Sequence, residues 1–215
     1  MICSLNQIEQ SARKAARGAG FAWGLADETG RAVRWLHANG FRGAAALADW
    51  LDGDIKSSGA PRSLGGVWRA PRGALDPLRT GAALGDCIES AGAVETGAIA
   101  HPLLAAGFLG DAAHIDELVI ELQWPGARLQ CMRGGARRGG TRAAFEAARA
   151  AHLKCSVARA PGTSAGLRRR AARFGECRVP RAVWLRLDRH ARRTYVEASE
   201  ASRLAGAGAG LHDND

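Results

Sequence analysis

The sequence predicts an α+β fold, in which a small antiparallel sheet with a central β-hairpin at about 118–133 is packed by N-terminal and C-terminal helices. Three observations predict it. Residues on one face alternate with those on the other over 118–124 and again over 128–132, a capped amphipathic helix signature stands near the start, and prolines open helical patterns at Pro102 and Pro180.

The hairpin is the clearest single element. Alternation runs over 118–124 and resumes over 128–132, and Pro125-Gly126 lies between the two halves as a turn. Two strands alone are only marginally stable in water, so further strands must join them. The segment 153–157, which follows a predicted helix at 141–151, is the candidate, and a β-β-α-β order results.

Helices are predicted for the N-terminal third. Ser4 is an N-cap with Gln7 three residues later, which is a capping box, and the helix ends at Gly18 or Gly20. A second helix covers about 25–37, with Asp27 placed four residues before Arg31 for an ion pair. A third covers 44–51.

We expect residues 1–215 to form a single domain. Its parts are a helical N-terminal part at about 4–52, a loop-rich connection at 53–81 with a short strand near 64–68, an α+β core at about 82–204 and a Gly-rich tail at 205–215. The core ends with a long helix opened by Pro180 and a short one at 199–204.

Arginine dominates the charge. Only three of the 30 basic residues are lysines, and the net charge is +9. Arginine forms paired hydrogen bonds with carboxylate or phosphate, so an anionic small molecule, a partner protein or a nucleic acid is a reasonable partner. The alternative is that GC-rich coding has replaced Lys by Arg across a solvated surface.

The five cysteines are far apart and include no CxxC pair, which argues against both a disulfide framework and a zinc site. No secretory signal is visible at the start, and the longest apolar stretch, at about 99–109, is too short to cross a bilayer. We therefore expect a cytoplasmic protein with no membrane contact, no metal and no cofactor. The oligomeric state is left open.

Two local patterns offer chemistry. The segment 162–166 fits G-x-S-x-G, with Asp188 and then His190 or His212 in hydrolase order, but a chain this rich in Gly and Ser contains such a match by chance too often for it to indicate catalysis. The Arg168–Arg173 loop, together with Arg137 and Arg138, is the best basic patch and could bind a phosphate backbone. The alternative is that these arginines are simply solvated loop residues.

Two stretches are distinctive together. They comprise residues 4–9, 14–20 and 23–26 at the start, and 193–196 with 199–203 before the glycine tail. In these residues the chain resembles an uncharacterised bacterial family, domain of unknown function 3726. The resemblance implies a bacterial, full-length, single-domain protein and supplies no reaction, cofactor or catalytic residue.

Two functions follow as hypotheses, and whether the protein is an enzyme stays open. The first is a small protein of metabolism that binds an anionic small molecule, or acts as an accessory subunit to a metabolic enzyme. Unusual polar and aromatic residues near the two ends are its candidate ligand-binding residues: Arg17, Trp23, His190, Arg193, Tyr195 and Ser199. The second is a nucleic-acid-binding module that uses the Arg168–Arg173 loop.

Overall fold

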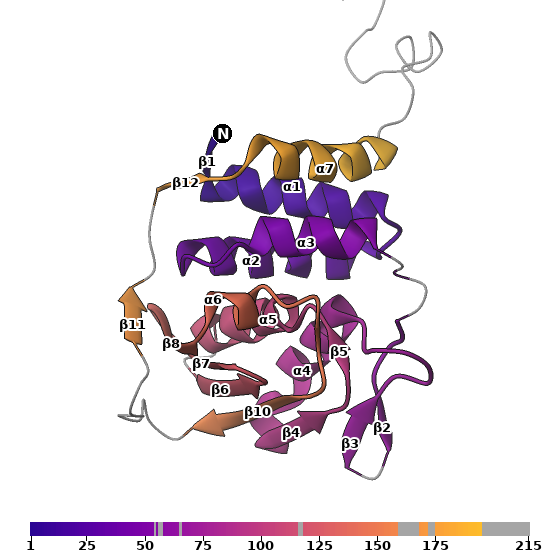
Figure 1. The fold of residues 1–215 in the computed structure, drawn as a ribbon, viewed down its shortest axis with the longest axis vertical. Helices are drawn as coiled ribbons and strands as arrows, with labels where there is room; N and C mark the ends of the chain where they lie inside the picture. Colours follow the sequence, from indigo (N-terminus) through magenta and orange to yellow (C-terminus); the bar gives the residue numbers. More distant parts are fainter. Residues whose placement is uncertain are drawn as a thin grey trace, which may run out of the picture.

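The chain is an α+β protein in which helices are stacked on one face of a mixed sheet (Figure 1). The structure, a computed structural model, describes residues 1–53, 55, 58–64, 66–115, 118–158, 168–171 and 175–194. The helices are α1 (Leu5–Gly18), α2 (Trp23–Ala38), α3 (Gly43–Asp52), α4 (Pro77–Ala91), α5 (Pro102–Ile115), α6 (Arg142–Phe145) and α7 (Arg181–Ala191), with the 3-10 turn η2 (Arg192–Thr194).

The strands of the main sheet are β2 (Arg62–Leu64), β3 (Val67–Arg69), β4 (Ala93–Thr96), β6 (Val119–Trp124), β7 (Ala127–Met132), β8 (Gly135–Gly140), β10 (Leu153–Ala158) and β11 (Arg168–Ala171). Their order is β11-β8-β7-β6-β10-β4-β3-β2, and all pairs are antiparallel except β3 with β4. Among the described residues, two short pairs lie outside it, β1 (Ile2–Ser4) with β12 (Glu176–Arg178) and β5 (Ile99–Ala100) with β9 (Arg149–Ala150).

The predicted hairpin forms and lies inside this sheet. Strands β6 and β7 pair with Leu122 opposite Leu129 around the turn at Gly126, whose φ is +77°. The alternating residues Ile120, Leu122 and Trp124 are buried on one face. Strand β10 pairs with β6, as the third-strand prediction required.

The expectation of a small sheet is wrong. Eight strands join it in the described part of the chain. Strand β8 has the sequence GARRGG, whose glycines and arginines carry little β-propensity, and β4 is only four residues long, so neither gives a clear strand pattern. They are strands because their neighbours in the fold supply hydrogen-bond partners, which is a tertiary effect.

The predicted helix at 141–151 is also wrong beyond its first turn. Thr141 caps α6 through a hydrogen bond from the Ala144 amide (3.2 Å), but the helix ends at Phe145. Residues Arg149–Ala150 instead pair with Ile99–Ala100. Backbone pairing with a distant segment has overridden the helix propensity of alanine there.

The N-terminal helix agrees with its prediction. Ser4 Oγ accepts a hydrogen bond from the Gln7 amide (3.1 Å), and Gln7 Oε1 accepts one from the Ser4 amide (2.8 Å). These two bonds form the capping box that satisfies amides left open by the first turn. The residues of the predicted apolar face are all buried: Leu5, Ile8, Ala12, Ala15 and Ala16.

The helices form successive layers above the sheet. Helices α4 and α5 pack on its inner face, α2 and α3 lie on α5, and α1 and α7 lie outermost (Figure 1). Glycines permit the closest approaches. A Cβ at Gly110 of α5 would overlap the Trp35 ring on α2, and one at Gly18 of α1 would overlap the His190 carbonyl on α7.

Ion pairs connect these layers. The predicted pair between Asp27 and Arg31 is absent: Asp27 pairs with Arg13 of α1 at 3.3 Å, and Arg31 pairs with Asp111 of α5 at 3.0 Å. Asp27 and Arg31 of α2 therefore each pair with a residue of a neighbouring helix and not with each other. The neighbouring helices offer partners that an isolated helix does not have.

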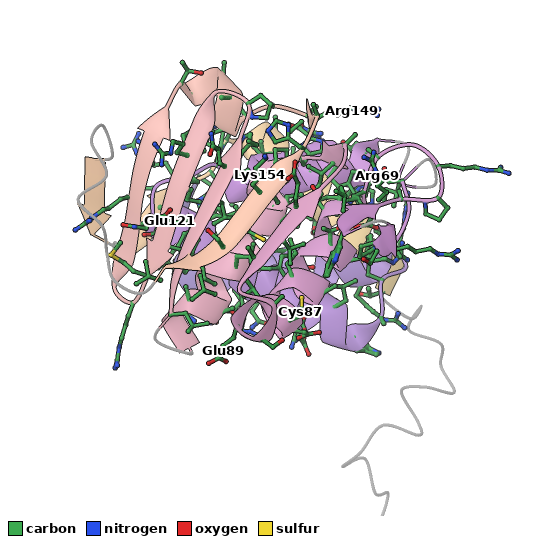
Figure 2. The ribbon with its side chains drawn as sticks, turned by 90° about the horizontal axis from the view of Figure 1, so that it is seen from below. Arg69, Cys87, Glu89, Glu121, Arg149 and Lys154 are labelled. Atoms are coloured by element: carbon green, nitrogen blue, oxygen red, sulfur yellow. The ribbon has the colours of Figure 1, made fainter. Side chains whose placement is uncertain are left out.

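The opposite face of the sheet is open and polar. Figure 2 looks onto it and shows Glu121 and Lys154 on its strands. Glu121 accepts a hydrogen bond from the Gln130 amide group (2.9 Å), and Lys154 pairs with Glu95 at 3.3 Å. In the described residues, no helix is both long enough and apolar enough to cross a membrane.

Candidate functional site

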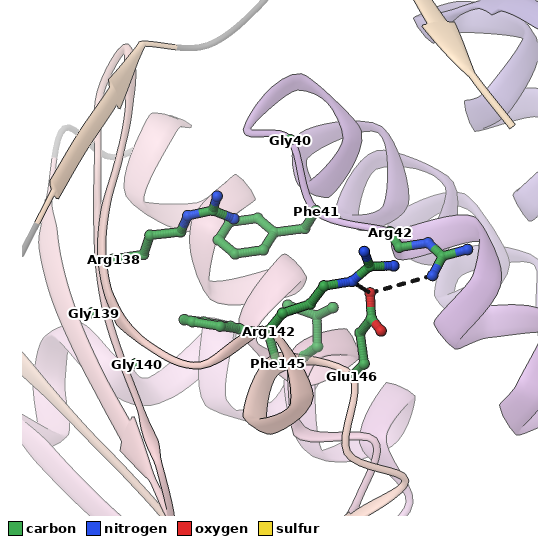
Figure 3. A pocket seen from close by; sticks show the side chains of 10 residues that line it. Gly40, Phe41, Arg42, Arg138, Gly139, Gly140, Arg142, Phe145 and Glu146 are labelled. Carbon is green, nitrogen blue, oxygen red and sulfur yellow. Dashed lines mark hydrogen bonds and ion pairs between the residues drawn. The ribbon is translucent and has the colours of Figure 1, made fainter.

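A cavity of about 510 Å³ lies between the helical layers and the β8 end of the sheet. We call it the arginine cavity and define it by Phe41, Arg42, Arg138, Arg142, Phe145 and Glu146, all of which line it (Figure 3). Its size is in the range of small-molecule sites.

The loop after α2 supplies one wall. The Gly40 amide bonds to the His37 carbonyl and the Phe41 amide to the Leu36 carbonyl, with Gly40 at φ +73°. This is a Schellman ending, which needs a left-handed residue and so favours glycine. It turns the chain sharply, so that Phe41 and Arg42 leave the helix at the cavity.

The passage from β8 to α6 supplies the opposite wall. Gly140 has φ +115°, and a Cβ there would overlap the Gly126 backbone of the hairpin turn. Only glycine fits this position, and it lets the chain turn directly into α6. Arg138, on β8, and Arg142, on α6, therefore lie on either side of one tight turn.

Aromatic contacts hold this wall in place. The Phe145 ring packs on Phe41 (centroids 5.2 Å apart) and edge-on against Trp124 (5.3 Å). Trp124 Nε1 donates a hydrogen bond to the Ala144 carbonyl at 2.9 Å. The short helix α6 is thus anchored to the buried face of the hairpin.

The charges in the arginine cavity are unbalanced. Glu146 Oε1 lies 2.8 Å from Arg142 Nε and 3.4 Å from Arg42 Nη1. Burial raises the pKa of Glu146, but the hydrogen bonds from the two guanidiniums outweigh it, and the pKa lies below its ordinary value. One ionised carboxylate therefore serves two arginines.

Arg138 has no such partner. Its guanidinium lies over the Phe41 ring, 5.2 Å from the ring centroid. No carboxylate of the described residues lies within ion-pair distance of it. A cation–π contact leaves the N–H groups at the edge of the guanidinium available to an anion.

A second cavity, of about 290 Å³, adjoins the first. We call it the histidine cavity; it is lined by Asp49, His101 and Arg186 together with residues shared with the arginine cavity. The shared residues are Arg42, Leu103, Phe145 and Glu146. Four common lining residues make the two cavities adjacent parts of one site.

The predicted ligand-binding residues lie elsewhere. Arg17 and Trp23 do come together: the Arg17 guanidinium is 4.9 Å from the Trp23 ring and donates to the Phe21 carbonyl at 3.0 Å. His190 and Arg193 are at the end of α7 and in η2, next to the end of α1. None of these four lines the two cavities, and their ligand role stays a prediction.

His190 belongs to an ion-pair network between α3 and α7. Its Nε2 lies 2.8 Å from Asp52 Oδ1, and Arg186 Nε donates to Asp52 Oδ2 at 2.6 Å. Burial alone would raise the pKa of Asp52. The hydrogen bonds from Arg186 and His190 lower it by more than burial raises it, so the pKa lies below its ordinary value. This network joins two helices and explains the position of His190 without a ligand.

Several other candidates fall outside the described residues: Tyr195, Ser199, the G-x-S-x-G segment at 162–166 and the glycine tail at 205–215. Residues 168–171 of the predicted arginine loop are a strand, β11, and not a loop. The described residues contain no group of three or more His, Cys, Asp or Glu side chains that could hold a metal ion. Burial raises the pKa of the Cys87 thiol and the Asp86 charge raises it further.

The sequence reasoning missed both cavities. Phe41, Arg42, His101 and Phe145 come from segments that are far apart in the chain, and no motif spacing joins them. The available signals were local: Asn39-Gly40 as a helix stop before Phe41-Arg42, and the run Arg137-Arg138-Gly139-Gly140.

Comparison with known families gives a match over the N-terminal third of the chain. Residues 3–73 match the family described as "Protein of unknown function (DUF3726)", which confirms the resemblance over this part of the chain. No curated protein matches the chain.

Among solved structures, malate dehydrogenase from Entamoeba histolytica is similar at 10% sequence identity and a TM-score of 0.41. The match covers 80% of this chain and 49% of that one, so the chain spans about half the length of the solved relative. A likeness at this level supports no statement about activity.

Proposed function

We propose that the protein binds an anionic small molecule, a carboxylate or a phosphate, in the arginine cavity. The observation that carries the proposal is the unpaired Arg138 beside two arginines that share one carboxylate. Three guanidiniums and one carboxylate leave an excess of positive charge, which an anion would balance.

The walls of the cavity support a small ligand. The rings of Phe41 and Phe145 restrict solvent on one side and strengthen the electrostatic interactions of the arginines with a bound anion. The guanidinium of Arg138 is held in place by the Phe41 ring, so little conformational entropy is lost when it binds. The role in metabolism, including that of an accessory subunit, stays a prediction.

The test is calorimetric titration of the full chain with inorganic phosphate, succinate and citrate at low ionic strength. We expect at least one of the three to bind and Arg138→Gln to weaken binding by about tenfold or more, the loss expected for a charge-assisted hydrogen bond. Arg72 is exposed and lines neither cavity, so Arg72→Gln is the matched control with the same change of charge. No binding of any probe, or equal losses in both variants, would contradict the proposal.

Nucleic-acid binding is the second candidate, and one observation favours it. Strand β11 pairs with β8 so that Arg168 lies opposite Arg138 and Arg169 opposite Arg137. The two arginine runs that are separate in the sequence are therefore neighbours at one edge of the sheet. This candidate predicts that affinity for single- or double-stranded nucleic acid falls steeply with salt, and no affinity at low ionic strength would exclude it.

A further inference from the structure

His101 has an unusual backbone. It is the one non-glycine residue with a positive φ in the described part of the chain, at +38°. Its amide donates to the Ala148 carbonyl at 2.9 Å, and its carbonyl accepts from the Leu104 amide at 2.8 Å. Left-handed backbone at a residue with a side chain is costly and occurs preferentially at binding and catalytic sites.

This conformation places the imidazole in the wall of the histidine cavity. The ring packs edge-on against Trp50, with centroids 6.1 Å apart. Within the described residues no side chain is hydrogen-bonded to the ring. The ring is thus positioned by packing, and its nitrogen atoms are available to a ligand.

The charges that face His101 come from every element around the cavity. They are Asp49 of α3, Arg42 before α3, Glu146 after α6 and Arg186 of α7. Arg186 is paired with Asp49 (2.7 Å) and Arg42 with Glu146 (3.4 Å), while Arg186 also pairs with Asp52 and Glu146 also pairs with Arg142. Protonation of His101 would add one positive charge to this end of the site.

Burial lowers the pKa of His101, and the charge of Asp49 opposes this only in part. The imidazole is accordingly neutral at pH 7 when the site is empty. An anionic group brought next to it favours the imidazolium form and raises the pKa again.

We propose that His101 is a second binding point that takes up a proton when a small dianion spans both cavities, with one acidic group at the arginines and the other at the imidazole. The inference rests on the proposed function, because the arginine cavity must hold the first group. It narrows the ligand class from anions in general to compounds with two separated acidic groups, of which short dicarboxylates are the simplest.

The sign of the linkage follows from the direction of the change. The complex binds one more proton than the free protein between the lower pKa of the empty site and the higher pKa of the complex. Affinity is therefore strongest below this window and falls by up to about tenfold per pH unit as pH rises through it. Above the pKa of the complex it no longer changes through His101.

The experiment is calorimetric titration of the full chain with succinate in two buffers of different ionisation enthalpy, repeated from pH 5.5 to 8. The difference between the buffers measures the protons taken up. We expect uptake approaching about one proton in the window for succinate. We expect clearly smaller uptake for acetate and inorganic phosphate, which occupy the arginine cavity alone.

The matched variant is His101→Asn, because asparagine tolerates left-handed backbone. It should still bind succinate, more weakly, and without proton uptake. Ring resonances of His101 in wild-type protein, followed by NMR, provide a readout that needs no variant: their titration midpoint should move to higher pH when succinate is added.

The outcomes separate the two proposals. Binding of succinate with no proton uptake and an unmoved His101 midpoint would overturn the role of His101 and leave anion binding intact. Uptake that persists in His101→Asn, or equals that of phosphate, would also overturn it. If wild-type protein binds none of the anions, the proposed function itself fails.

Discussion

Acid should destabilise this protein through one buried histidine, His37. It lies near the end of α2 with 9% of its surface exposed, and its Nε2 accepts a hydrogen bond from the Ala44 amide at 3.1 Å. That amide is in the first turn of α3. The N-cap residue of α3 is Arg42, and its side chain makes no capping hydrogen bond. His37 thus caps a neighbouring helix, and only its neutral form can accept this bond.

The magnitude follows from the pKa. Burial lowers the pKa of His37 to about 4 from an ordinary value of 6.5. As pH falls below 6.5, the unfolded chain binds a proton at this residue and the folded protein does not, so stability falls with pH until the folded form is also protonated near pH 4. Each tenfold change in a protonation constant corresponds to about 1.4 kcal/mol, so about 2 kcal/mol of unfolding free energy is lost by pH 5.

The assay is urea unfolding of wild type and His37→Gln at pH 7, 6 and 5. Glutamine offers an acceptor of similar reach but does not titrate in this range, so the variant removes the pH dependence of His37 and retains that of other groups. We expect the stability difference between the two proteins to change by about 2 kcal/mol from pH 7 to pH 5. A difference that stays constant would refute the assignment of a low pKa to His37.

Two further predictions concern the outer helices. Ser4→Ala removes one half of the capping box and should lower the unfolding free energy by about 1 kcal/mol. Ser11→Ala removes a hydroxyl from the middle of the same helix and should change the unfolding free energy by less than about half as much. Urea unfolding of the two variants measures both effects. Gly18→Ala places a methyl group against the His190 carbonyl and should cost about 1–3 kcal/mol, while Gly24→Ala, which has open space around it, should be neutral or slightly stabilising. Equal thermal midpoints for the two glycine variants would argue against the close contact of α1 and α7.

Elements stabilised by nearby residues were predictable. The capping box of Ser4 and Gln7, the helix stop at Asn39-Gly40 and the hairpin around Gly126 all depend on contacts within a few residues, and the structure contains each of them. Helix α4 shows where this reasoning was incomplete. Its N-cap is Asp76, which accepts hydrogen bonds from the Leu78 and Arg79 amides. The many Gly and Pro residues that precede Asp76 in the sequence led to the prediction of a loop up to residue 81.

The site was the least predictable part. His37 bonds to Ala44, only seven residues further on, but Arg42 pairs with Glu146, which is 104 residues away in the chain. His101 followed by Pro102 predicted a helix start and gave no sign of a left-handed backbone. His101 follows strand β5, which pairs with β9 so that Ala100 lies opposite Arg149, 49 residues further along the chain. The backbone around His101 therefore depends on a long-range contact that no local pattern reveals.

The sequence by itself determined the α+β class, the capped first helix, the central hairpin and the excess of arginine, because short-range hydrogen bonds, apolar periodicity and composition decide these features. The tertiary structure alone decided the size of the sheet, the partners of Asp27 and Arg31, and which arginines lack a carboxylate. The physical reason is that weak strands and charged side chains have several partners of similar energy within reach. The packing of the layers selects among them, and it is the same packing that brings Arg138 and Phe41 to one wall of a cavity and His101 to the next.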